Sequence, residues 1–119
     1  MRPADAYPSG MVERERNVER RLVDLVRRRG GLCLKWTSPG TVGVPDRIVV
    51  MPGGRIYLVE LKRPGGRPRP SQVAFHAKLA RRGVRVHVVD DADAFARDVL
   101  DSGEQGVHPV EPVGDGEGQ

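Results

Sequence analysis

Apolar positions recur along the chain with two periods, one typical of helices and one typical of strands. The helical spacing of three to four residues marks three segments, 11–29, 71–82 and 91–100. Short apolar runs bounded by turn residues mark four strands, 32–36, 47–51, 56–62 and 84–89. The predicted order is therefore α-β-β-β-α-β-α, which is a small mixed α/β domain.

Capping residues support these helix boundaries. Gly30 and Gly83 directly follow the first two predicted helices, where glycine commonly ends a helix. Ser71 is placed to cap the start of the second helix, and either Asp90 or Asp91 is placed to cap the third.

Both ends of the chain lie outside this pattern. Residues 1–10 and the Gly-, Pro- and acid-rich residues 102–119 offer too little apolar area to offset the entropy of ordering them. We predict two disordered tails around one domain at residues 11–101. The 119 residues have room for a single modest core, and no internal repeat is visible.

The amino-acid composition indicates in which cellular compartment the protein is expected. No apolar run approaches the roughly 20 residues that cross a bilayer, and the first ten residues lack the apolar stretch of a signal peptide. Cys33 is the only cysteine, so an internal disulfide is impossible. We expect a cytoplasmic protein in a reducing compartment, without membrane contact.

Charge is distributed unevenly. The net charge is +4, but residues 101–119 hold five acids and no Lys or Arg. The first 100 residues therefore carry 20 basic and 11 acidic side chains, a net of +9. A cationic body attracts polyanions such as nucleic acid, although an arginine-rich composition can also reflect a GC-rich genome.

Charged residues stand at the ends of two predicted strands, where apolar ones are expected. Asp46 precedes the strand 47–51, and Glu60 and Lys62 end the strand 56–62. Side chains two apart on a strand share a face, so Glu60 and Lys62 point the same way about 6.6 Å apart. Charge there costs several kcal/mol unless a partner, a metal or solvent compensates it, which indicates a binding site.

The turn between these strands decides whether Asp46 joins Glu60. A three-residue loop at 52–54 puts Met51 opposite Arg55 and, counting back, Asp46 opposite Glu60. A loop of two or four residues puts Asp46 opposite Leu61 instead. Pro-Gly-Gly suits the three-residue loop, which we prefer. Two adjacent carboxylates repel and favour a divalent cation, and hard oxygen ligands with a nearby lysine suit Mg²⁺ and phosphodiester hydrolysis.

Each residue also has an ordinary interpretation. Asp46 could be a turn aspartate, and Glu60 with Lys62 an exposed edge-strand pair. Gln72 could be a first-turn helix residue. We assign no function to His76 or His87, because neither lies in a matching cluster in the sequence.

The residues in order match a known pattern. G-x-P-D at 43–46, E-x-K at 60–62 and Gln72 at a helix start resemble the VRR-NUC nucleases of the PD-(D/E)xK superfamily. The resemblance covers roughly residues 17–100 and is closest to standalone members carried by phages. It implies a restriction-endonuclease-like core, with a central mixed β-sheet flanked by helices.

The resemblance also implies roles for individual residues. Asp46 and Glu60 match the metal-binding acids, and the Leu61 carbonyl is expected to complete their hold on Mg²⁺ or Mn²⁺. Lys62 matches the catalytic lysine and Gln72 the motif glutamine. The acid of the first helix matches Glu19, although Glu15 falls in the same helical arc. The choice of Glu19 therefore depends on the family, and Glu19 could instead pair with Arg16 or Arg20.

These roles lead to an expected function. We expect a metal-dependent DNA endonuclease whose phosphate contacts come from Arg63, Arg67 and Arg69. Selectivity for junctions or flaps and a homodimeric state are further expectations. A noncatalytic DNA-binding module is the alternative, against which the intact acids and lysine argue. RNA is less favoured, because only five Phe, Trp and Tyr residues are available for base stacking.

Overall fold

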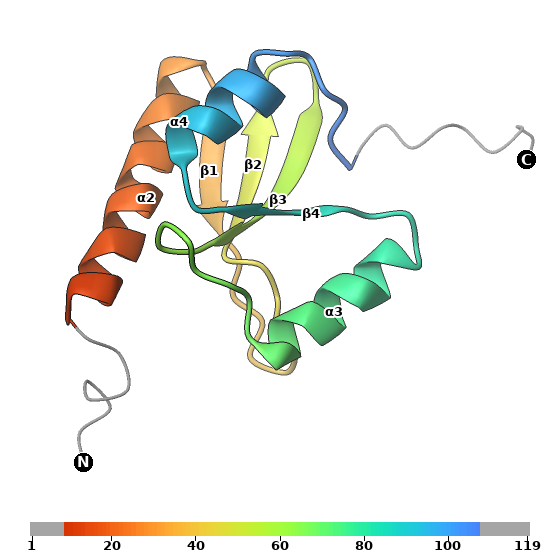
Figure 1. The fold of residues 1–119 in the computed structure, drawn as a ribbon. Helices are drawn as coiled ribbons and strands as arrows, with labels where there is room; N and C mark the ends of the chain where they lie inside the picture. The colour runs from red at the N-terminus through yellow and green to blue at the C-terminus, as the bar shows by residue number, and fades with distance from the viewer. Residues whose placement is uncertain (1–8, 108–119) are drawn as a thin grey trace, which may run out of the picture.

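A four-stranded sheet with helices on both of its faces makes up the described part of the protein (Figure 1). The structure, a computed structural model, describes residues 9–107. The elements in chain order are α2 (Ser9–Arg28), β1 (Leu32–Lys35), β2 (Arg47–Met51), β3 (Arg55–Leu61), α3 (Pro70–Ala80), β4 (Val86–Val89), α4 (Ala92–Phe95) and a π-helical turn, η1 (Ala96–Leu100). The predicted α/β class and element order are confirmed.

The sheet is mixed, as predicted. Its strands run in the order β1-β2-β3-β4. The first three pair antiparallel and are joined by short connections, whereas β3 and β4 pair in parallel. A parallel pair needs a crossover, and α3 supplies it. The crossover brings α3 to the end of β3, where Glu60 lies.

The turn between β2 and β3 has the predicted three residues. Met51 pairs with Arg55, and the register continues to Arg47 opposite Val59. Gly53 and Gly54 have φ of 87° and 80°, a left-handed backbone that glycine adopts without strain. The confirmed register places the next pair of positions, 46 and 60, across from each other.

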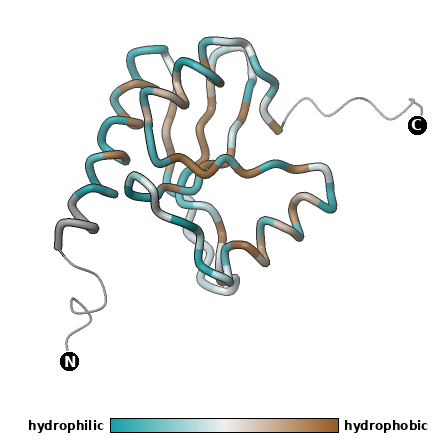
Figure 2. Tube along the Cα trace, viewed as in Figure 1, coloured by the Kyte–Doolittle hydropathy of each residue, from teal (hydrophilic) through white to brown (hydrophobic). Residues whose placement is uncertain are grey.

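The hydrophobic core lies between one face of the sheet and the helices α2 and α4 with η1, which lie side by side in Figure 1. Tyr57, Val59 and Leu61 of β3 point into it and are at most 2% exposed. Leu22 and Val26 of α2 are completely buried against them. Figure 2 shows the resulting pattern, with hydrophobic residues along the strands and hydrophilic ones along much of α2.

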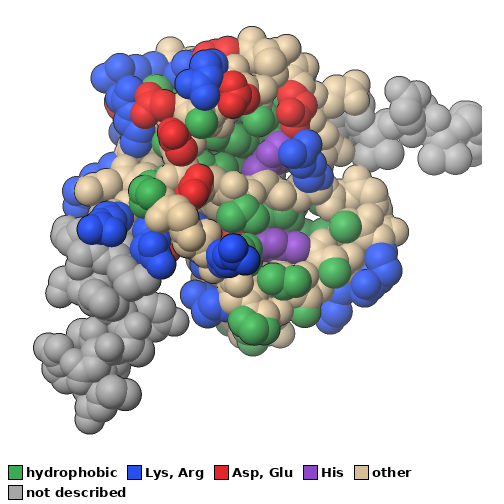
Figure 3. Space-filling view, in the orientation of Figure 1, with side chains coloured by type: hydrophobic (Ala, Val, Ile, Leu, Met, Phe, Trp, Pro, Cys, Tyr) green, Lys and Arg blue, Asp and Glu red, His purple; other side chains and the backbone are tan. Residues whose placement is uncertain are grey.

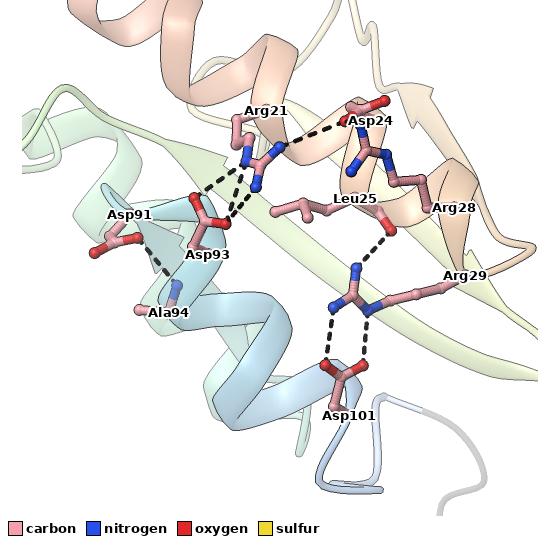
Figure 4. A network of polar contacts seen from close by, with 9 residues as sticks. All are labelled: Arg21, Asp24, Leu25, Arg28, Arg29, Asp91, Asp93, Ala94 and Asp101. Atoms are coloured by element: carbon pink, nitrogen blue, oxygen red, sulfur yellow. Dashed lines mark hydrogen bonds and ion pairs between the residues drawn. The ribbon is translucent and has the colours of Figure 1, made fainter.

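Exposed ion pairs tie α2 to the last helical segment (Figure 4). Arg21 donates to both carboxylate oxygens of Asp93, and Arg29 makes a two-pronged contact with Asp101 at 2.7 and 2.8 Å. Arg29 also donates to the Leu25 carbonyl at 3.0 Å. These contacts join the two helical segments at the surface of the layer.

Two helix boundaries differ from prediction. Arg69, not Ser71, is the N-cap of α3, because Pro70 takes the first helical position, which needs no N–H donor. Asp91 does cap α4, accepting from Ala94 N at 3.0 Å. The last predicted helix changes after Phe95 into a π-helical turn, in which Asp101 N donates to Ala96 O. Within residues 9–107, every helix is too short or too polar to cross a bilayer.

The predicted tails are described only in part. Helix α2 already begins at Ser9, inside the predicted N-terminal tail, and residues 1–8 and 108–119 lie outside the described residues. Residues 102–107 fold back onto the sheet, contrary to the prediction. Val107 N donates to Ile56 O at 2.7 Å, and the Tyr57 hydroxyl donates to Glu104 O.

Candidate functional site

Asp46 and Glu60 converge where β2 begins and β3 ends. Asp46 Oδ2 accepts a hydrogen bond from Leu61 N at 2.8 Å, which fixes the Asp46 carboxylate beside the end of β3. Glu60 points to the face of the sheet opposite the core and is only 1% exposed. The three-residue turn predicts this convergence, and the charge of Asp46 is one of the causes that raise the pKa of Glu60.

The electrostatics of Glu60 are unusual for a carboxylate. Burial, followed by the negative charge of Asp46, raises the pKa of Glu60 to about 8, while Lys62 acts in the opposite direction. Glu60 Oε1 is buried and has no hydrogen-bond partner among the described residues. An acidic group held in this way takes up a cation readily, because a cation removes both the repulsion and the unsatisfied oxygen.

Lys62 and Gln72 contact the other oxygen of Glu60. Lys62 Nζ lies 3.5 Å from Glu60 Oε2, and its side chain is 8% exposed. The Gln72 amide donates to the same oxygen, and its own carbonyl accepts from Arg69 N at 2.8 Å. Gln72 thus links the first turn of α3 to the buried carboxylate.

His76 is the residue at this site that sequence reasoning missed. It lies one helical turn after Gln72, so both side chains point from α3 toward Glu60. His76 Nε2 is 3.8 Å from Glu60 Oε1. Burial, and then the charge of Lys62, lower the pKa of His76. The spacing of four residues from Gln72 was the signal in the sequence that could have found it.

Glu19 and Glu15, the two candidate acids of the first helix, differ in their surroundings. Glu19 Oε2 binds the Arg47 guanidinium at 2.9 and 3.1 Å, so its carboxylate has another partner. The pKa of Glu15 is raised, mainly by partial burial, with Lys62 acting in the opposite direction and Asp46 adding to the rise. The charges of Lys62 and Asp46 therefore act on Glu15.

The predicted phosphate contacts lie on the connection between β3 and α3. Arg67 and Arg69 are exposed and Arg63 is half-buried, with its guanidinium 3.2 Å from Pro64 O. All three lie in the connection that begins at Lys62. Their contacts with phosphate, and the role of the Leu61 carbonyl, stay predictions.

The residues present fit a hard divalent cation. Two adjacent carboxylates, one with an unpartnered buried oxygen, supply oxygen ligands of the kind Mg²⁺ and Mn²⁺ take. In the described residues, no group of three or more His, Cys, Asp or Glu side chains converges on one point. A cation here would thus keep several positions for water or a phosphate, as Mg²⁺ commonly does.

Comparisons with known proteins agree with one another. The family model described as the VRR-NUC domain matches residues 5–92. A protein of Acyrthosiphon pisum secondary endosymbiont phage 1, named "Putative nuclease p44", is 48% identical over 80 residues, which are 67% of this chain and 86% of the relative. A solved structure described as "VRR_NUC domain" matches with a TM-score of 0.65 and 30% identity, covering 73% of this chain and 95% of that one.

Proposed function

This chain belongs to the VRR-NUC domain family of nucleases, and we propose that it is a Mg²⁺- or Mn²⁺-dependent endonuclease that hydrolyses phosphodiester bonds of DNA. One observation carries the proposal. A buried carboxylate with an unpartnered oxygen, Glu60, lies beside a second carboxylate, Asp46, and 3.5 Å from the Lys62 ammonium. Acids and a lysine at such distances suit the binding of a cation and a phosphate together.

The roles of the residues follow from their contacts. Asp46 and Glu60, with the Leu61 carbonyl, would hold the cation. When bound, such a cation polarises a phosphate oxygen and makes a neighbouring water more acidic. Lys62 stabilises the negative charge that develops on the phosphate, since a compact ammonium on a flexible stem can follow that charge. Gln72 keeps the Glu60 carboxylate in place through its bond to Oε2.

The acid on α2 has a supporting role in this proposal. Glu15 lies within the field of Lys62 and Asp46, so we assign it, rather than Glu19, to orienting water at the site. Glu19 has a different task, because it neutralises Arg47 next to Asp46.

DNA is supported as the substrate by the charge around the site. Arg63, Arg67 and Arg69 follow the lysine, and their guanidinium groups suit the oxygens of a phosphate backbone. The phage relative is named as a nuclease, and a nuclease with one free thiol fits the cytoplasm of a bacterial or infected cell.

A homodimer is part of the proposal. The sheet face away from the core carries apolar side chains on the edge strand β1, where Leu32 and Leu34 are 58% and 47% exposed, and on β4, where Val88 is 45% exposed. Figure 3 shows hydrophobic side chains gathered over α3 as well, with Lys and Arg at their rim. Antiparallel sheets that face water usually alternate with polar residues, so this face is typical of one that is covered.

A second copy is a suitable cover. One copy offers one cleavage site, and its 13.1 kDa provide little surface for gripping branched DNA, whereas two copies offer two sites for two strands. Sedimentation of the full chain should give a dimer, and Leu34→Glu should give a monomer. A wild-type monomer at the concentrations used for cleavage would contradict the dimer.

One set of gels tests the nuclease proposal. The full chain is incubated with duplex, nicked, flap and four-way-junction DNA and with matching RNA, in Mg²⁺, Mn²⁺, Ca²⁺ or EDTA. We expect cleavage of DNA in Mg²⁺ and Mn²⁺, little cleavage in Ca²⁺ and none in EDTA. Glu60→Gln should bind DNA without cutting it, while the exposed control Asp98→Asn should cut normally. Cleavage in EDTA, or normal cleavage by Glu60→Gln, would refute the proposal.

A further inference from the structure

Two buried polar atoms lack a hydrogen-bond partner in the described residues, and they face each other. They are Glu60 Oε1 and His76 Nε2, and they lie 3.8 Å apart. A buried donor or acceptor without a partner destabilises the fold, because it has lost its hydrogen bonds to water without replacement. Since neither atom is accessible to water, a hydrogen bond between the two would give each of them a partner.

The two atoms are chemically complementary. A carboxylate oxygen accepts hydrogen bonds, and an imidazole nitrogen that carries hydrogen donates them. At 3.8 Å they are not yet bonded, but a movement of roughly 1 Å brings them to the usual distance of about 2.9 Å.

We propose that His76 is a positioning residue for Glu60, whose Nε2–H donates to Oε1 while the Gln72 amide donates to Oε2. Both oxygens of the carboxylate are then held by one helix, and each keeps a second lone pair for a cation. This inference rests on the proposed function, because it takes Glu60 as a cation ligand.

Helix α3 is anchored firmly enough for this task. Phe75 packs edge-on against Trp36 with the ring centroids 6.2 Å apart. A Cβ at Gly43 would collide with the Ser71 carbonyl, so the loop before β2 lies directly against the first turn of α3. The Gln72 carbonyl also accepts from Arg69 N. The helix that orients Glu60 is thus fixed at its start and along one face.

The contact has a consequence for cation binding. Hydrogen bonds that orient a ligating carboxylate typically change metal affinity by about 10–100-fold. Without His76, the polar contacts of Glu60 among the described residues are all at Oε2, from Gln72 and Lys62, so the carboxylate can turn about that oxygen. We therefore expect a weaker hold on the cation, and recovery of that hold when the lost donor is replaced.

The first measurement tests the contact itself and needs no metal or activity. Long-range ¹H–¹⁵N correlation spectra of the metal-free full chain, recorded at a pH above the Glu60 pKa of about 8 so that this carboxylate is ionised, report which nitrogen of each histidine carries hydrogen. The His76 signal is assigned by its loss in His76→Gln. We expect hydrogen on Nε2, and a His76 imidazole with hydrogen only on Nδ1 would overturn the inference.

The second measurement compares Mn²⁺ affinity by titration calorimetry. His76→Leu should bind Mn²⁺ about 10–100-fold more weakly than the wild type. His76→Gln, which keeps a donor at the ε position, and the exposed control Lys78→Ala should bind close to normally. His76→Leu binding as tightly as the wild type would overturn the inference. A wild type that ignores Mn²⁺ but carries hydrogen on Nε2 would refute the proposed function and leave the His76 contact standing.

Discussion

The two faces of the sheet bury different kinds of side chain, apolar ones on one face and charged ones on the other. Toward α2 and α4, strand β3 presents Tyr57, Val59 and Leu61, which are buried among apolar side chains. Charge on that side lies in the exposed pairs of Figure 4 and in the part-buried Arg47, which is paired with Glu19. Toward α3, the same strand buries Glu60, and Lys62 follows it at 6% exposed.

The difference separates stability from function. Buried apolar area stabilises the fold, whereas a buried carboxylate beside another carboxylate destabilises it until something compensates the charge. The raised pKa of Glu60 expresses that cost. Substitutions on the two faces should therefore have opposite effects on activity and on unfolding.

The largest effect is expected from the polar face. Asp46→Asn should lower the rate of DNA cleavage at least about 10³-fold, because a cation ligand contributes several kcal/mol to the transition state. The fold should remain, since the side-chain oxygen of the introduced asparagine can still accept from Leu61 N, as Asp46 does. Cleavage rates and thermal unfolding of the same preparations check both statements.

If Asp46→Asn cleaved DNA normally but unfolded at a lower temperature than the wild type, Asp46 would contribute to stability and not to activity, contrary to this account. Asp98→Asn, at an exposed carboxylate paired only with Arg97 among the described residues, serves as the control that should change neither quantity.

The next effect is expected from the apolar face. Leu22 is completely buried in the core, so Leu22→Ala should lower the free energy of unfolding by about 2–5 kcal/mol. Leu34, which is 47% exposed on the other face, should cost about 1 kcal/mol or less when changed to Ala in the monomer. Urea unfolding measures both, and equal losses would show that the two faces contribute alike.

A smaller effect is expected from pH. Between pH 4.5 and about 8, Glu60 keeps its proton in the folded state and has lost it in the unfolded state, so the folded state binds more protons. Stability of the metal-free protein must then fall as pH rises in this range. The histidines with lowered pKa values act in the opposite direction, but in the unfolded state, with an ordinary pKa of about 6.5, they are mostly deprotonated above about pH 7. From about pH 7 to about pH 8, the fall should therefore be about 1 kcal/mol.

Urea unfolding at several pH values checks this slope. Glu60→Gln should remove most of it, and an unchanged slope in that variant would assign the effect to other groups.

The smallest effect is expected from the exposed ion pairs. Arg29→Ala removes the contact with Asp101, but this pair is open to solvent and salt. The unfolding midpoint should move much less than in Leu22→Ala, and the remaining difference should vanish in high salt. A shift as large as that of Leu22→Ala would mean that surface charge, not burial, holds the helical layer.

Local rules predicted the hairpin and much of the site. Pro-Gly-Gly in a three-residue turn required Met51 opposite Arg55, and that register is confirmed. The register then brings Asp46 beside Glu60. The arrangement depends on neighbouring residues in one hairpin, so the sequence was sufficient.

Contacts between distant segments were not predictable in this way. Glu19 and Glu15 share one helical arc, and only the position of Arg47 in the fold decides which acid has another partner. His76 gains its role from the crossover that lays α3 against Glu60. Residues 102–107 look like a tail until their hydrogen bonds to β3 are seen.

The central claim, that the polar face of the sheet binds a divalent cation through Glu60, is tested most directly by calorimetric titration of the metal-free full chain with Mn²⁺ at about pH 7 in two buffers of different ionisation enthalpy. Because Glu60, with a pKa of about 8, is mostly protonated at this pH, binding should release about one proton per cation. Glu60→Gln should neither bind comparably nor release that proton. Equal binding by Glu60→Gln, or wild-type binding without proton release, would contradict the claim.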